Sequence, residues 1–257
     1  MLSPSDVPPF EVWLEALRRR HLARASTSEI EKGIRLLSTL YVERRARMES
    51  GSSALDGEAK RAAFALFYTP VHFLLVQRIV QALGAASPPP KAILDLGCGL
   101  GVAGAAWALE AGGVPQVDGV DQNPWAVEEA RWTLKTLGLQ GRARRGDLLS
   151  GRFPGNDGAV VAAFTVNELD APTRSRLLRT LLSTHERGAR ILVVEPIAKP
   201  VTPFWDEWSA AFLAQGGRAD EWRFPADLPP EIESLDRGAG LEHRELTART
   251  VSLGLGA

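Results

Sequence analysis

The stretch AILDLGCGLGVAG, residues 92–104, constrains the fold of this chain more than any other feature. Its first five residues, 92–96, are mostly apolar and predict a buried strand, and the glycines that follow predict a tight turn. A helix is expected to begin near Val102. Strand, glycine-rich loop and helix in this order are typical of α/β proteins that bind a nucleotide-like cofactor at the carboxyl ends of parallel strands.

Two cofactor classes fit this loop. The spacing Gly99-x-Gly101-x-x-Gly104 satisfies the short pattern of dinucleotide-binding loops, in which backbone approaches a pyrophosphate. In another frame Asp95 precedes glycines at 97, 99 and 101, which resembles the first motif of the Rossmann-like class I S-adenosylmethionine (SAM) dependent methyltransferases. A carboxylate at position 95 would repel pyrophosphate and attract the ammonium group of SAM. The loop therefore favours SAM over a nicotinamide cofactor, with glycines that let the ligand approach closely.

Composition narrows the class of protein. The chain has 257 residues, of which 45% are hydrophobic, enough for a packed core. We find no apolar run near the ~20 residues of a membrane span, and no signal peptide, so we expect a cytoplasmic protein with no membrane partner. The single cysteine, Cys98, excludes an intrachain disulfide and any multi-cysteine metal centre. The four histidines are scattered, and we expect no metal site.

Charge is unevenly distributed along the chain. The net charge is −1, with 11 acidic and 5 basic residues in 195–245 and an excess of basic residues before it. Arginine clusters occur at 18–20, 44–47 and 142–145. Such clusters can follow a phosphate backbone, or they can be solvated faces of a neutral protein. We favour solvated faces and keep an RNA footprint as the alternative.

The first 86 residues are expected to form an N-terminal helical domain for substrate recognition or as a lid. Phe10, Trp13, Leu14 and Leu17 share one helix face. Ser28-Glu29-Ile30-Glu31 is a capping-box pattern, and Ile30, Ile34, Leu37 and Tyr41 line the helix that it begins. A further helix is predicted over 58–68. Another is predicted from Thr69-Pro70 to Gly84.

Beyond the proline-rich connector at 87–90, residues 91–257 are expected to form the SAM-binding domain. Strands alternate with helices there, which predicts a mainly parallel sheet with helices on both faces. A seventh strand is not evident. The predicted strands are 92–96, 116–120, 142–146, 159–164, 190–195 and one within 242–252, and the helices are 102–111, 124–137, 170–188, 204–215 and 228–237.

Acidic side chains follow the second and third strands of this domain. Asp121, with its neighbour Gln122, is expected to contact the two ribose hydroxyls of the cofactor, and Asn123 to cap the next helix. Asp147, next to Leu148, is at the position where similar methyltransferases hold the adenine amino group. Together with Asp95, Gly97, Cys98, Gly99 and Gly101, these residues form the predicted SAM site.

The segment after the fourth strand should face the methyl group of the cofactor. Methyl transfer is an in-line displacement, so an enzyme must position the acceptor and exclude water. Asn167 and Glu168 are the predicted catalytic groups, with Glu168 as a base if the acceptor must lose a proton and Asn167 also near the cofactor. Asp170 is predicted to cap the following helix.

Two target chemistries are disfavoured. Base-amino methyltransferases commonly carry Asn/Asp-Pro-Pro-aromatic at this point, and Asn167-Glu168-Leu169-Asp170 keeps only the first residue. Covalent methylation of cytosine carbon 5 needs a cysteine near the target base. Cys98 lies in the cofactor loop, where it is read as a small residue tolerated between two glycines.

Three short strings carry a narrower resemblance. Phe67–Arg78, Val166–Leu169 and Val193–Pro196 are similar to the mitoribosomal small-subunit methyltransferase-like family and its bacterial relatives. That family is associated with small-subunit ribosomal RNA and ribosome assembly. Its members often hold a metal or iron–sulfur centre on a cysteine cluster, which a chain with one cysteine lacks.

The sequence leaves three functions open. The first is methylation of RNA, with ribosomal RNA or the small ribosomal subunit as partner. The second is methylation of a small molecule or a protein side chain, which near-neutral charge favours. The third is a SAM-binding assembly factor with little catalysis. The oligomeric state is not predicted.

Overall fold

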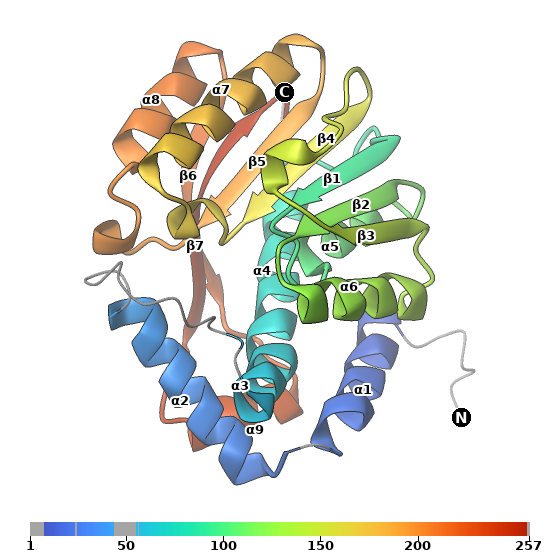
Figure 1. Cartoon of the computed structure of the whole chain (residues 1–257), viewed down its shortest axis with the longest axis vertical. Helices are drawn as coiled ribbons and strands as arrows, with labels where there is room; N and C mark the ends of the chain where they lie inside the picture. The colour runs from blue at the N-terminus through green and yellow to red at the C-terminus, as the bar shows by residue number, and fades with distance from the viewer. Residues whose placement is uncertain (1–7, 24, 44–54, 56, 256–257) are drawn as a thin grey trace. The chain divides into compact units, whose positions relative to one another are not determined.

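The computed structural model describes residues 8–23, 25–43, 55 and 57–255. Within them lies a seven-stranded sheet of order β3-β2-β1-β4-β5-β7-β6 (Figure 1). The first five strands are parallel, and β7 runs antiparallel to β5. The strands are β1 (Ala92–Leu96), β2 (Gln116–Asp121), β3 (Gly141–Arg145), β4 (Gly158–Ala163), β5 (Arg190–Glu195), β6 (Arg218–Pro225) and β7 (Glu245–Leu253).

Helices cover both faces of this sheet, as predicted. On one face pack α5 (Val102–Glu110) and α6 (Pro124–Thr136), and on the other α7 (Ala171–Glu186) and α8 (Trp205–Ala214) (Figure 1). The strand period of two explains this arrangement. Leu94 and Leu96 of β1 join the buried cluster that includes α7 and α8, whereas Asp95 between them faces α5. The α/β fold class is therefore confirmed.

Strand β6 is the seventh strand that the sequence did not reveal. Half of its residues are charged, so it carries no apolar run. Asp220, Trp222 and Phe224 are nevertheless half-buried, and the residues between them are exposed. The Trp222 indole N–H donates to Thr250 Oγ1 on β7 at 2.9 Å. This alternation is that of an edge strand with one face in solvent.

Residues 58–82 form one continuous helix, where two were predicted. It consists of α3 (Glu58–Ala63), a π-helical turn η1 (Phe64–Tyr68) and α4 (Thr69–Ala82). The Thr69 hydroxyl donates to the Phe64 carbonyl at 2.9 Å, so Thr69 lies inside the helix and caps no new one. Pro70 has no N–H to donate and would crowd the carbonyl four residues earlier, which the wider turn accommodates. The predicted end near Gly84 is confirmed.

The same helix corrects the expectation about apolar length. By length and composition the helix could cross a membrane. This length was not expected from the sequence, because Thr69-Pro70 has the signature of a helix start. Within the protein, 61% of its most apolar window is buried. Burial of this extent is what the core helix of a folded domain shows.

The helices outside the sheet form a unit of their own. Met1–His72 groups with Pro225–Leu246, and Phe73–Phe224 groups with Thr247–Ala257. The predicted division into 1–86 and 91–257 differs from this grouping. The reason is α9 (Pro230–Gly238), which packs on α2 (Thr27–Glu43) through buried Ile232 and through a hydrogen bond from Arg35 to the Gly238 carbonyl at 2.8 Å. Sequence distance conceals such a contact.

The helical unit starts with α1 (Pro9–Leu22) and α2. Trp13, Leu14 and Leu17 are buried as predicted, but Phe10 is only half-buried. The capping box of α2 lies two residues earlier than predicted. The Ser26 hydroxyl accepts the Glu29 N–H at 3.4 Å, and the Glu29 carboxylate accepts the Ser26 N–H at 2.8 Å. The buried face consists of Ile30, Ile34 and Leu37, and the Tyr41 side chain lies outside the described residues.

Candidate cofactor site at the carboxyl edge of the sheet

The predicted site residues gather at the carboxyl ends of neighbouring parallel strands. Asp95 lies in β1, Asp121 ends β2, and Asn167 follows β4. Because β1 pairs with both β2 and β4, the direction of strand progression reverses at β1. A ligand crevice in an open α/β sheet forms at such a reversal. The fold therefore brings these three residues to the edge where a cofactor would bind.

The glycine loop has the backbone shape that the motif predicts. Gly97, Gly99 and Gly101 have φ of 62°, 49° and 79°. A Cβ on Gly97 would lie 2.4 Å from Cγ2 of Thr165, and one on Gly101 would lie 3.2 Å from Cβ of Ala130. We expected these glycines to leave room for a ligand. At 97 and 101 the neighbours are protein atoms, so packing and positive φ already require glycine.

Asp95 is buried beneath this loop, with 1% of its surface exposed. Its Oδ2 accepts the Gly104 N–H at 2.9 Å in the first turn of α5. Burial raises the pKa of Asp95 to about 7, and the charge of Asp121 adds to the rise. Asp95 thus anchors the start of α5. Its contact with a cofactor ammonium group stays a prediction.

Cys98 points its side chain into the core. The thiol is 5% exposed and packs in a cluster with Val127, Ala130 and Ala143. Close approach on β2 is possible because residue 119 is glycine, where a Cβ would lie 2.8 Å from the Cys98 sulfur. Burial raises the pKa of the thiol well above its usual value, which keeps it protonated. This environment disfavours a nucleophilic role for Cys98.

Asp121 joins the end of β2 to the glycine loop. Its Oδ2 accepts the Gly99 N–H at 2.9 Å, and its Oδ1 accepts the Asn123 N–H at 2.8 Å. A carboxylate has about four acceptor positions, so two are free for ribose hydroxyls. Asn123 caps α6 as predicted, accepting the N–H of Trp125 at 3.0 Å. Gln122, between Asp121 and Asn123, is exposed. The two hydroxyl donors of a SAM ribose fit the free acceptor positions of the Asp121 carboxylate.

Asp147 and Leu148 follow β3 in a short 3-10 turn. The exposed Asp147 carboxylate caps this turn by accepting the Leu149 N–H at 2.7 Å. Leu148 is buried. The structure thus gives Asp147 a capping role. An adenine contact through its other oxygen stays a prediction.

Glu195, at the end of β5, is the residue that sequence reasoning missed. Its side chain is fully buried, and Oε1 accepts the N–H groups of Thr165, Val166 and Asn167 at 3.1, 2.7 and 3.4 Å. Burial raises its pKa to about 8. The only signal was an acidic residue closing an apolar strand before Pro196. Glu195 holds the turn η3 (Val166–Glu168) in place.

The turn held by Glu195 carries both predicted catalytic groups. Asn167 is half-buried, and its Oδ1 is a buried acceptor without a hydrogen-bond partner among the described residues. Glu168 is exposed. Asp170 caps α7, as predicted, by accepting the Thr173 N–H at 2.7 Å. A buried acceptor left open is costly in a folded protein, so Asn167 is suited to receive a donor from a ligand.

The described part of the chain contains no group of three or more His, Cys, Asp or Glu side chains placed to hold a metal ion.

The strand order and the site together define a class of protein. A sheet of order 3-2-1-4-5-7-6 with an antiparallel seventh strand, a glycine loop after β1 and a carboxylate after β2 is the arrangement of class I SAM-dependent methyltransferases. Mitomycin 7-O-methyltransferase shares this fold, with a TM-score of 0.52 and 17% identity over 96% of this chain and 73% of that one. A class I methyltransferase from Listeria monocytogenes gives a TM-score of 0.50 and 13% identity over 95% and 87% of the two chains.

Family and sequence comparisons agree with the fold. Residues 74–184 match the family model of the methyltransferase small domain. Ribosomal RNA small subunit methyltransferase C of Chromohalobacter salexigens is 30% identical over 199 residues, which cover 72% of this chain. The chain spans 57% of the length of that relative. Residues 74–184 therefore form a methyltransferase small domain on the fold of the class I SAM-dependent methyltransferases, whose cofactor is SAM.

Proposed function

We propose that the protein is a cytoplasmic SAM-dependent methyltransferase that acts on RNA of the small ribosomal subunit. The observation that carries the proposal is the pair of carboxylates around the glycine loop, Asp95 beneath it and Asp121 beside it. SAM carries an ammonium group and two ribose hydroxyls, and carboxylates can accept hydrogen bonds from all of these groups. The bound cofactor supplies an activated methyl group.

The residues of the turn after β4 would then position the acceptor. The three backbone N–H groups on Glu195 fix the turn, and the unpartnered Asn167 Oδ1 would accept a hydrogen bond from an amino or hydroxyl group. Fixing that group in line with the transferred methyl is the main catalytic task. Glu168, at the exposed end of the turn, would take the proton that the acceptor releases.

An RNA acceptor is supported by two independent likenesses. The 30% identical relative has ribosomal RNA in its name. The three short strings around Phe67, Asn167 and Glu195 resemble a family associated with the small ribosomal subunit.

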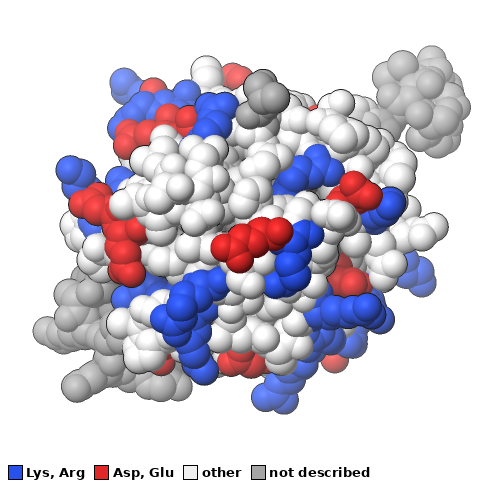
Figure 2. Space-filling model, turned by 90° about the horizontal axis from the view of Figure 1, so that it is seen from above, with Lys and Arg blue, Asp and Glu red and all other residues white. Residues whose placement is uncertain are grey.

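A small molecule or a protein side chain is the second candidate, and charge favours it. The net charge is −1, and basic and acidic side chains are interspersed over the face in Figure 2. An RNA enzyme usually presents a continuous basic surface. A SAM-binding assembly factor with little catalysis is the third.

Transfer of label from tritiated SAM tests the three candidates together. The protein is incubated with extract from cells that lack it, and the extract is fractionated into RNA, protein and small molecules. Label in 16S ribosomal RNA is expected, with Asp121→Ala as the control that reduces it. Label in protein or in small molecules would replace the RNA assignment. SAM binding by calorimetry without transfer to any fraction would indicate an assembly factor.

A further inference from the structure

We infer that the RNA backbone binds along the outer edge of β3, on the side chains of Arg131, Arg142, Arg144 and Arg145. We call these four residues the basic edge. The inference rests on the proposed RNA substrate and names the surface that would receive it. Strand β3 ends the sheet on one side, next to β2, and all four arginines belong to β3 or to α6 beside it (Figure 1).

Three of these arginines keep their full charge available. Arg131 donates to the Ala143 carbonyl at 2.7 Å, Arg144 to the Ser150 hydroxyl at 3.3 Å, and Arg145 to the Gln122 carbonyl at 3.2 Å. Each acceptor is neutral, and the described residues provide no carboxylate within ion-pair distance of any of the three. A guanidinium has five N–H donors, so several remain for phosphate oxygens.

The acidic groups at this edge compensate only part of the charge. Arg142 pairs with Asp118, with Nε 2.9 Å from Oδ1. Asp147 is exposed just after β3, and one of its oxygens is engaged by the Leu149 N–H. Strand β3 itself carries three arginines and no acidic side chain, so its edge keeps an excess of positive charge. A polyanion is the ligand that such an excess attracts.

The position of the basic edge connects it to the cofactor site. In the pairing of β2 with β3, Arg145 lies opposite Asp121, the predicted ribose ligand. The main chain of Gln122, which Arg145 contacts, belongs to the same turn. A backbone that follows β3 toward its carboxyl end would therefore lead a nucleotide to the edge where the methyl donor binds.

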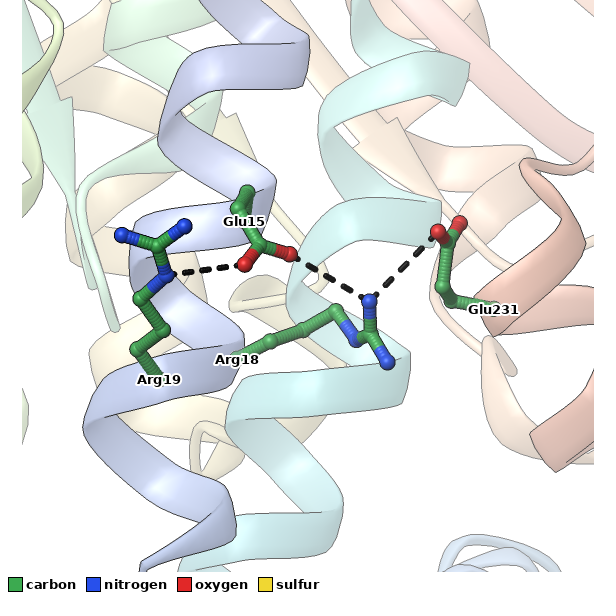
Figure 3. Close-up of polar contacts among 4 residues, drawn as sticks. All are labelled: Glu15, Arg18, Arg19 and Glu231. Atoms are coloured by element: carbon green, nitrogen blue, oxygen red, sulfur yellow. Dashed lines mark hydrogen bonds and ion pairs between the residues drawn. The ribbon is translucent and has the colours of Figure 1, made fainter.

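The arginines of α1 provide a contrast. Figure 3 shows Glu15 between Arg19 and Arg18, at 2.8 and 3.3 Å, and Arg18 also reaching Glu231 of α9 at 3.4 Å. Two carboxylates thus offset two guanidiniums within the helical unit. A phosphate would have to compete with these partners, and little counterion release would follow. The cluster at 44–47 lies outside the described residues.

Salt-dependent binding of a fluorescein-labelled single-stranded RNA distinguishes the two surfaces. We compare full-length wild type with Arg144→Gln/Arg145→Gln and with the matched double variant Arg18→Gln/Arg19→Gln, which removes the same formal charge. The slope of log Kobs against log salt should fall by about 0.7 for each lost phosphate contact on a single strand, hence about 1.4 in the first variant. The second should keep the wild-type slope. Arg144→Lys/Arg145→Lys should also keep it, because the charges remain.

Four results would overturn the inference: an unchanged slope in the Arg144→Gln/Arg145→Gln variant, equal loss of slope in both glutamine variants, a larger loss in the α1 variant, or failure of wild type to bind the RNA. Calorimetry with SAM on the same samples separates this failure from failure of the proposed function. A protein that binds SAM and labels RNA, but whose Arg144→Gln/Arg145→Gln variant binds RNA like wild type, has its RNA surface elsewhere. A protein that does not bind SAM lacks the proposed function altogether.

Discussion

The carboxylate of Asp121 accepts the backbone N–H of Gly99 across 2.9 Å, so that the end of β2 holds the loop that follows β1. The other oxygen of the same carboxylate accepts the Asn123 N–H at 2.8 Å, where α6 begins. One side chain therefore fixes both the glycine loop and the start of α6. The cofactor loop is shaped before any ligand arrives, which reduces the entropy cost of binding.

Replacing Asp121 tests this arrangement directly. Asp121→Ala should weaken SAM binding by about 1–3 kcal/mol, because the ribose hydroxyls lose a charged acceptor and the loop loses its support. Calorimetry measures the affinity, and thermal unfolding without SAM shows whether the variant is folded. Asp121→Asn keeps one acceptor oxygen, so its affinity for SAM should lie between those of wild type and of the alanine variant. An unchanged affinity in the alanine variant would remove Asp121 from the site.

The glycine loop should tolerate a methyl group poorly at position 97. Gly97→Ala combines a positive φ with a Cβ 2.4 Å from Thr165, so a conformational cost of about 1–2 kcal/mol is joined by an overpacking cost of about 1–3 kcal/mol. Gly84→Ala is the matched control, since Gly84 has φ of 60° and no atom within 4 Å of the added Cβ. Denaturant unfolding should therefore rank Gly97→Ala as the less stable variant. Equal losses would mean that Thr165 moves aside freely.

Stability should depend on pH through Glu195. Its pKa rises from 4.5 to about 8 on folding, so between these values the folded protein holds a proton that the unfolded chain has released. The free energy of unfolding must then fall as pH rises from about 4.5 to about 8 and level off above. Glu195→Gln keeps an acceptor for the three N–H groups and cannot ionise. Urea denaturation across this range should show that the free energy of unfolding of the variant depends less on pH. The remaining dependence comes from Asp95, whose pKa is about 7. A profile as steep as that of wild type would contradict the assignment to Glu195.

Removing the exposed carboxylate of Glu168 should lower the turnover rate and leave SAM binding unchanged. Glu168→Gln should bind SAM like wild type and lower kcat by about 10²- to 10⁴-fold if the acceptor must lose a proton. Asn167→Ala should instead raise KM for the acceptor, because its open Oδ1 receives a donor. Full turnover by the glutamine variant would reduce Glu168 to a structural residue.

Local sequence patterns predicted much of this structure. Alternation of apolar runs with glycine and proline placed the strands that end at Leu96 and Glu195 to within a residue, because a parallel strand buried on both faces must be apolar. Asp121, which ends β2, and Asp147, which follows β3, were predictable as acidic residues at strand ends, whereas the buried Glu195 was missed. A charge is tolerated where the strand leaves the core.

Elsewhere the local pattern was misleading. Strand β6 has no apolar run, since an edge strand buries only one face, here through Trp222 and Phe224. Thr69-Pro70 has the signature of a helix start but lies inside a continuous helix, directly after a π-helical turn. The capping box at Ser26 was hidden by a second serine–glutamate pattern beginning at Ser28. For β6 the deciding neighbour is distant in sequence, since Thr250 of β7 accepts the Trp222 indole N–H.

By itself, the sequence determined the α/β class, the glycine loop and the acidic residues on either side of it, because strand period and backbone sterics act over a few residues. Only the tertiary structure decided that Glu195 holds the turn of Asn167, from 28 residues away. The tertiary structure also decided which arginines are neutralised, as Arg18 is by Glu231, and which stay available, as Arg144 is. Hydrogen bonds and ion pairs act over a few ångströms, and the fold alone sets which distant residues come that close.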